Sequence, residues 1–82
     1  MSIVYVMITC DVGFEEPVIN QLKTIEGIKE VIGVIGTYDI IIKLESSDLE
    51  NLKNIIPSKI RKIQNIRTTL TLSVIESQEV ES

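Results

Sequence analysis

Apolar positions recur with two different periods along this chain, and these periods predict six elements. Segments rich in β-branched residues predict strands at 3–10, 29–35, 38–45 and 66–75. Apolar residues three or four positions apart predict one helix over about 15–25 and a second from Leu49 to Ile63. The predicted order of elements is therefore βαββαβ.

The ends of these elements carry residues that are typical of helix starts, stops and turns. Acidic residues open the first helix, and Gly27 follows its last apolar position. We expect Ser46 or Ser47 to cap the second helix, and Pro57 to kink or restart it. The short gap at Gly36-Thr37 predicts a β-hairpin between the second and third strands.

This order of elements predicts an α+β fold. With right-handed crossovers, βαββαβ gives the ferredoxin-like sandwich, a four-stranded antiparallel sheet with both helices on one face. The 82 residues have room for a single domain. We expect that domain to span residues 1–76, followed by a flexible acidic tail over residues 77–82.

The predicted sheet is apolar on both faces. Two helices cover only one face, so a second face in contact with water should be polar, yet the first three strands carry apolar residues at odd and even positions alike. Only the last strand alternates, with Ile66, Thr68, Leu70, Leu72 and Val74 on one side and Arg67, Thr69, Thr71 and Ser73 on the other. A large apolar patch is unusual on a monomer, so we expect two copies to pack sheet to sheet. Singly exposed valines and isoleucines, which are ordinary on monomers, are the alternative.

The composition excludes several classes of chemistry. Histidine is absent and Cys10 is the only cysteine, so neither a Ser-His or Cys-His catalytic pair nor a paired-cysteine metal site can form. We therefore expect no enzymatic activity, no cofactor and no metal. The net charge of −4 argues against direct binding of nucleic acid, and no apolar run reaches the length of a membrane span. We expect a cytoplasmic protein.

Two groups of residues are candidates for binding a small molecule. Hydroxyls two positions apart on the last strand, at Thr69 and Thr71, can both donate and accept hydrogen bonds. The turn at residues 36–39 offers Gly36, which permits positive φ, and Asp39, which could accept from a ligand ammonium group. Taken alone, these residues are more typical of an ordinary strand and a structural turn than of a binding site.

The hairpin and the last strand together resemble a known family. The turn Val34-Ile35-Gly36-Thr37-Tyr38-Asp39-Ile40 and the strand Ile66-Arg67-Thr68-Thr69-Leu70-Thr71-Leu72 are similar to the effector-binding (RAM) domain of Lrp/AsnC transcription regulators. The resemblance covers about residues 3–76. Those regulators also carry an N-terminal helix-turn-helix domain, whereas this chain starts at the first strand, so it resembles a stand-alone form of the module.

The resemblance implies an assembly and a site. Dimers would form by apposing their sheets into a dimeric α/β barrel and would assemble further into an octamer or similar ring. An amino-acid effector would bind between dimers, and the residues that carry over by position are Gly36, Thr37, Tyr38, Asp39, Thr69 and Thr71, with Arg67 a less certain partner of the carboxylate. Such a module would act in regulation of transcription or metabolism. Alternatively, it would be an assembly partner that forms mixed oligomers with full-length Lrp/AsnC regulators.

Overall fold

The computed structural model describes residues 2–75 and contains the six predicted elements. In chain order they are β1 (Ser2–Cys10), α1 (Glu15–Leu22), β2 (Ile28–Gly33), β3 (Ile40–Ser46), α2 (Leu49–Ile55) and β4 (Ile66–Ser73), and a π-helical turn, η1 (Ile56–Ile60), directly follows α2. The predicted tail at residues 77–82 lies outside the described residues, so the domain boundary at residue 76 stays a prediction.

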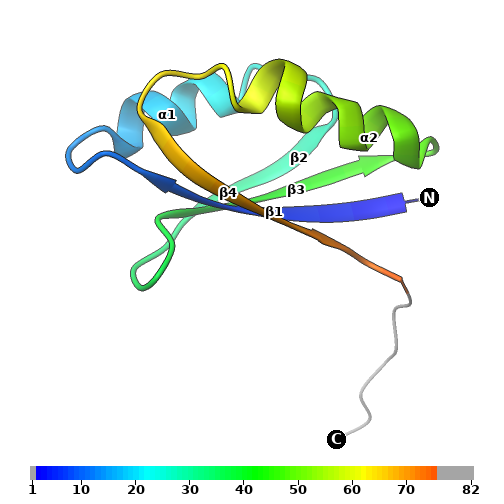
Figure 1. The fold of residues 1–82 in the computed structure, drawn as a ribbon, viewed down its shortest axis with the longest axis horizontal. Helices are drawn as coiled ribbons and strands as arrows, with labels where there is room; N and C mark the ends of the chain where they lie inside the picture. Colours follow the sequence, from blue (N-terminus) through cyan, green and yellow to red (C-terminus); the bar gives the residue numbers. More distant parts are fainter. Residues whose placement is uncertain (1, 76–82) are drawn as a thin grey trace, which may run out of the picture.

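The four strands form one antiparallel sheet in the order β2-β3-β1-β4. Both helices lie on the same face of this sheet, and the loop between β2 and β3 extends beyond the opposite face (Figure 1). The α+β ferredoxin-like fold predicted from the order of elements is confirmed. Among residues 2–75, no helix has the length and apolar character that crossing a membrane requires.

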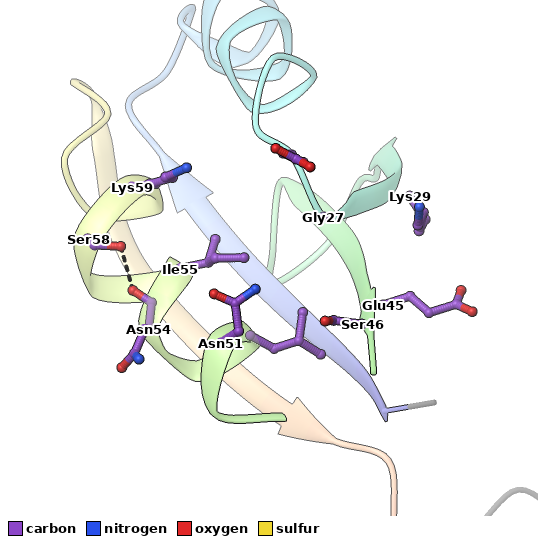
Figure 2. Close-up of a pocket in the computed structure, with 11 residues that line it drawn as sticks. Gly27, Lys29, Glu45, Ser46, Asn51, Asn54, Ile55, Ser58 and Lys59 are labelled. Carbon is purple, nitrogen blue, oxygen red and sulfur yellow. Dashed lines mark hydrogen bonds between the residues drawn. The ribbon is translucent and has the colours of Figure 1, made fainter. Parts of the chain in front are cut away.

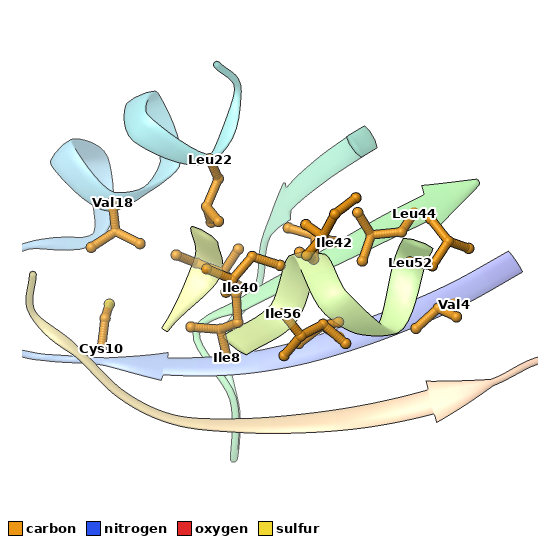
Figure 3. Packing of buried hydrophobic residues seen from close by; sticks show 13 residues of the cluster. Val4, Ile8, Cys10, Val18, Leu22, Ile40, Ile42, Leu44, Leu52 and Ile56 are labelled. Carbon is orange, nitrogen blue, oxygen red and sulfur yellow. The ribbon is translucent and has the colours of Figure 1, made fainter. Parts of the chain in front are cut away.

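The core lies between the sheet and the two helices (Figure 3). Alternate residues of β1 and β3 point toward the helices because side chains along a strand alternate between faces. The buried residues from the sheet are Val4, Val6, Ile8, Cys10, Ile40, Ile42 and Leu44, and those from the helical layer are Val18, Leu22, Leu52, Ile55, Ile56 and Ile60. This packing on the central strands β1 and β3 leaves β2 and β4 as partly covered edges.

The first helix is shorter than its apolar pattern predicts. The pattern runs to Ile25, but α1 ends at Leu22, and the N–H of Ile25 donates to the Leu22 carbonyl in a tighter turn, at 3.1 Å. The Gln21 carbonyl accepts from both the backbone N–H of Thr24, at 3.1 Å, and its hydroxyl, at 2.7 Å, which closes the end of the helix. Gly27, the predicted stop, has φ +98° and belongs to the turn into β2.

The second helix begins at Leu49, as its apolar pattern predicts, but its cap lies later than either predicted serine. Its cap is Asp48 and neither serine, because the Asp48 carboxylate accepts from the N–H of Glu50 at 3.0 Å and of Asn51 at 3.5 Å. Pro57 has no N–H to donate, and the chain passes it through η1. The N–H of Arg61 donates five residues back to the Ile56 carbonyl, at 3.0 Å. The predicted restart of the helix is therefore a π-turn.

The hairpin connection is longer than the predicted two-residue turn. The second strand ends at Gly33 and the third begins at Ile40, so the loop contains residues 34–39. The N–H of Val34 donates to the carbonyl of Asp39, at 2.8 Å, and closes the loop. The loop is longer because Gly36 adopts φ +150° inside it and Asp39 bonds to β1, so neither residue continues a strand.

Candidate functional site

The loop of residues 34–39 presents three of the predicted site residues at the end of the sheet. Gly36 has φ +150°, and a Cβ added there would meet no atom within 4 Å. Thr37 is exposed and Tyr38 is half-buried. The backbone at Gly36 is thus open to solvent, and only its conformation requires glycine.

Asp39, the fourth predicted residue of the loop, already has a protein partner. Its Oδ2 accepts a hydrogen bond from the backbone N–H of Cys10, at 2.9 Å, and its own N–H donates to the carbonyl of Ile8, at 2.9 Å. Both bonds join the loop to the end of β1. The bond from the Cys10 N–H uses Oδ2, so the other carboxylate oxygen, Oδ1, can take a donor from a ligand.

The side chain of Cys10 lies in the core beside this carboxylate. Burial raises the pKa of the Cys10 thiol, and the negative charges of Asp39, Glu15 and Asp11 raise it further. A thiol that resists ionisation is a weak nucleophile and a weak metal ligand. Within the described part of the chain, no three cysteine or carboxylate side chains lie together as metal ligands would.

The predicted hydroxyls of β4 lie on the helix side of the sheet. Thr69 is paired with Ile8 and Thr71 with Val6, and both partners point toward the helices. Thr69 is half-buried and Thr71 is exposed, because β4 is an edge strand beyond the cover of the helices. The Oγ1 of Thr69 accepts from the Nε of Arg61, at 3.3 Å.

The predicted face of β4 is wrong for its first residue, Ile66. The register shifts between Thr9 and Cys10, so that Thr68 pairs with Thr9 but Ile66 pairs with Cys10. This bulge turns Ile66 toward the core, away from the side of Leu70. Strict alternation along the strand predicts that Ile66 and Leu70 lie on the same face.

Two arginines flank the start of β4, and one of them was not predicted. Arg61, Arg67 and Thr69 line a hollow of about 290 Å³. The carboxylate of Asp11 lies 3.9 Å from the Nε of Arg67 and also accepts from the side chain of Asn65, at 3.1 Å. Guanidinium groups beside a hydroxyl are suited to a carboxylate. The sequence pattern assigned Arg61 to the end of the second helix. The sharp turn at Asn65, which has φ 73°, reverses the chain and brings β4 beside Arg61.

The two halves of the predicted site lie at the same end of the sheet but apart. Ile8 of β1 pairs with Ile40 of β3 on one side and with Thr69 of β4 on the other. Thr69 therefore lies across the sheet from Ile40, the residue that follows Asp39. Two strand spacings, about 9.5 Å, separate β3 from β4. Thr71 lies a further two residues along β4, and no loop residue lines the arginine hollow. One chain alone therefore brings these residues to the same end of the sheet but does not enclose a ligand between them.

The face of the sheet away from the helices is apolar, as its sequence predicts. We call it the open face, and it consists of Ile3, Tyr5 and Met7 of β1, Ile32 of β2, Ile41 of β3, and Leu70 and Leu72 of β4. Leu70 and Leu72 are each 44% exposed and Ile32 is 48% exposed. Large apolar side chains gathered on one uncovered face are characteristic of an interaction surface.

Comparison with known proteins decides the family. A family model described as the Lrp/AsnC ligand binding domain matches residues 3–80. The chain belongs to this family. It is therefore a regulatory, ligand-binding module, as the hairpin and β4 motifs predicted, and the match extends over both of them.

Solved structures agree with this assignment. A hypothetical protein from Pyrococcus horikoshii is 32% identical, with a TM-score of 0.84 over 94% of this chain and 93% of that one. The protein FFRP-DM1 is 33% identical, with a TM-score of 0.85 over 92% of this chain and all of that one. AsnC of E. coli superposes with a TM-score of 0.87 over 55% of its own length, and at 21% identity this likeness concerns the fold alone.

A curated relative places the same module in a different context. The homocitrate synthase of Saccharolobus islandicus is 36% identical over 72 residues, which make up 87% of this chain. The chain spans about 15% of the length of that enzyme. Domains similar to this chain thus occur within a larger biosynthetic enzyme as well as within regulators.

Proposed function

We propose that this chain is an oligomeric amino-acid sensor that acts in regulation by binding, without catalysis. The observation that carries the proposal is that the carboxylate of Asp39 lies at the same end of the sheet as the hydroxyl of Thr69 and the arginines around it. A carboxylate oxygen suits an ammonium group, and guanidinium groups suit a carboxylate. An amino acid carries both of those groups, and the chain belongs to a ligand-binding family.

The open face supports the oligomeric part of this proposal. Its seven apolar residues come from all four strands and would leave water if a second copy packed against them. Polar residues such as Lys43 and Glu45 lie beside them on the same face of β3, as at the rim of an interface. We infer a dimer formed by two open faces, which corresponds to the dimeric α/β barrel of the resemblance.

The distance between the two halves of the site favours a ligand held between copies. The ammonium and carboxylate of an α-amino acid are attached to the same carbon, whereas Asp39 and Thr69 are separated by about two strand spacings. A neighbouring dimer that supplied the other half would remove this mismatch. In a ring of dimers, the loop of residues 34–39 would face β4 of the next dimer, with Gly36, Thr37 and Tyr38 beside the ligand.

Isothermal titration of the assembled protein with each of the twenty amino acids tests this function. We expect one amino acid, or a few of related shape, to bind saturably. One regulator of this fold was solved with L-methionine, but at 6% identity that likeness concerns the fold alone, so methionine is one member of the panel. Absence of binding by every amino acid to an assembled oligomer would contradict the proposal.

Two substitutions locate the binding. Thr69→Val removes the hydroxyl at nearly constant shape, and we expect about tenfold weaker binding because a buried polar partner is lost. Thr68→Val is the matched control, since Thr68 is adjacent but bonds to Thr9 on the other face. Equal affinities of the two variants would remove Thr69 from the site.

Similarity to a segment of homocitrate synthase favours a second candidate function. A module that occurs as 15% of a biosynthetic enzyme could act on such an enzyme in trans, through mixed dimers of open faces. The corresponding candidate on the regulator side is co-assembly with full-length Lrp/AsnC proteins. Co-expression of the tagged chain with each partner class tests both, because mixed oligomers support the partner that forms them and strict self-sorting contradicts both.

A further inference from the structure

A second hollow lies at the other end of the sheet from the loop of residues 34–39 (Figure 2). Its volume is about 420 Å³, within the range of small-molecule pockets. Asn51, Ile55 and Lys59 line it from the helical segment, and the start of β2 and the end of β3 line it from the sheet. Because β3 runs from Ile40 beside the loop to Ser46 beside this hollow, the two places are the length of the strand apart.

The base of this hollow is fixed and apolar. Leu52 is fully buried beneath it and Ile55 is 7% exposed. Gly27 adopts φ +98°, and a Cβ there would lie only 3.3 Å from the Cδ1 of Ile55, so the backbone approaches the helix as closely as glycine permits. The carbonyl of Gly27 accepts from the N–H of Glu45, at 3.1 Å, which ties the turn to β3.

The helical wall is shaped by the passage of the chain past Pro57. Asn51 and Ile55 are one α-helical turn apart and point from the helix toward the strands (Figure 2). The hydroxyl of Ser58 donates to the carbonyl of Asn54, at 2.5 Å, and this bond supports the start of η1. Lys59 follows within η1 and lines the same hollow. The helical wall is therefore held by η1 and by the bond from the Ser58 side chain.

Charges of both signs line the hollow without neutralising one another. Lys29 and Lys59 are cationic, and Glu26 and Glu45 are anionic. Within residues 2–75, none of these four forms an ion pair within 4 Å. The side-chain amide of Asn51 makes no hydrogen bond to the described residues either, since only its backbone N–H is bonded. Lys59, Glu26 and the amide of Asn51 are therefore available to a ligand in the hollow, whereas Glu45 pairs with Ile3 and belongs to the open face.

We propose that this hollow binds a small zwitterion of amino-acid size. Lys59 and the amide of Asn51 would hold its carboxylate, Glu26 would hold its ammonium group, and the apolar base would contact its side chain. The site goes beyond the proposed function because one chain supplies every residue. Asn51, Ile55 and Lys59 line it from the helical segment, and both helices lie on the face opposite the open face, so pairing of the open faces leaves these residues accessible.

A titration of the full isotope-labelled protein followed by amide resonances tests this site. The probes are glycine, L-glutamine, L-lysine and L-glutamate, with succinate and 1,4-diaminobutane as controls that carry only one sign of charge. We expect at least one of the amino acids to shift the amides of Gly27, Asn51 and Lys59 saturably, and neither control to do so. Absence of saturable shifts at these amides with all four amino acids up to about 10 mM overturns the proposal, and so does equal binding of a control.

Matched variants separate this site from general charge effects and from the site at the other end. We expect Lys59→Gln and Glu26→Gln to weaken binding of the shifting probe about tenfold. Lys53→Gln and Glu50→Gln remove the same charges from α2 outside the hollow, and we expect them to change affinity less than about twofold. Equal losses in both sets overturn the proposal. Loss of the Asn51 shift in Thr69→Val would likewise overturn the proposal, because Thr69 lies at the other end of the sheet. If the hollow binds none of the probes, the site between dimers is still tested by the isothermal titration.

Discussion

The carboxylate of Asp39 accepts a hydrogen bond from the backbone N–H of Cys10, at 2.9 Å, across 29 positions of the chain. The bond joins the loop between β2 and β3 to the end of β1, where the register with β4 also shifts. Asp39 thus supports the geometry of the same edge at which its free oxygen would meet a ligand. A candidate binding residue is at the same time a structural one, and substitutions must separate the two roles.

Asp39→Asn and Asp39→Ala separate them. Alanine leaves the N–H of Cys10 without an acceptor, and we expect the free energy of unfolding to fall by about 1–3 kcal/mol. The amide oxygen of asparagine still accepts, so we expect a loss below about 1 kcal/mol, with amino-acid binding weakened because the charge is gone. Denaturant unfolding and titration of both variants measure this. Equal stability of the two would show that the bond to Cys10 contributes nothing.

The open face predicts a second pair of variants. Leu72→Glu places a carboxylate on the open face, within the inferred dimer interface, and we expect dimerisation to weaken at least about a hundredfold. Ser73→Glu adds the same charge one residue later on the helix side of β4, and we expect it to leave the dimer intact. Sedimentation velocity over a range of concentrations distinguishes them. An unchanged dimer in Leu72→Glu would place the interface elsewhere.

The order of elements and the faces of most strands could be predicted because they follow from local periodicity. Val4, Val6 and Ile8 alternate with Tyr5 and Met7, and the structure buries the first three and leaves the others on the open face. The errors occur where a tertiary contact competes with the period. Ile25 continues the helical pattern, but the chain must turn toward Gly27 to enter β2, so α1 ends earlier.

The candidate site was predictable in its residues and not in its geometry. The sequence identifies Asp39 and Thr69, but only the sheet order shows that β1 lies between them. Arg61 joins Thr69 because Asn65 reverses the chain, and that contact depends on a φ of 73° that no periodicity encodes. The hollow beside Asn51 combines three separate segments, so no single motif marks it.

The buried thiol predicts a dependence of stability on pH. The pKa of Cys10 is raised above its ordinary value of 9.0 by burial, and then by Asp39, Glu15 and Asp11. Above that ordinary value, the unfolded chain releases the thiol proton while the folded chain retains it. Folding is therefore disfavoured as pH rises from about 9 toward the folded pKa, by up to about 1.4 kcal/mol per pH unit.

Cys10→Ala isolates this effect from other groups that titrate in alkaline solution. The variant is less stable at neutral pH because it loses buried volume, but we expect its stability to fall less steeply above pH 9 than that of the unchanged protein. Parallel pH profiles of the two proteins, measured by denaturant unfolding, would show that the thiol does not titrate differently in the folded state.

Gly36 predicts a cost that arises from the backbone alone. Its φ of +150° is a conformation that side chains rarely adopt, yet a Cβ there would meet no atom within 4 Å. We expect Gly36→Ala to lower the free energy of unfolding by about 1–3 kcal/mol, through strain and not through a clash.

Gly33→Ala is the control, because Gly33 does not have positive φ and its Cβ would lie 3.6 Å from the Cδ1 of Ile19, an ordinary contact. We expect that variant to stay within about 1 kcal/mol of the original stability. If Gly36→Ala also stayed within about 1 kcal/mol, the loop would have relaxed and the backbone of Gly36 would not be strained. The affinity of this variant for amino acids would then show whether the bond between Asp39 and Cys10 is enough to hold the site.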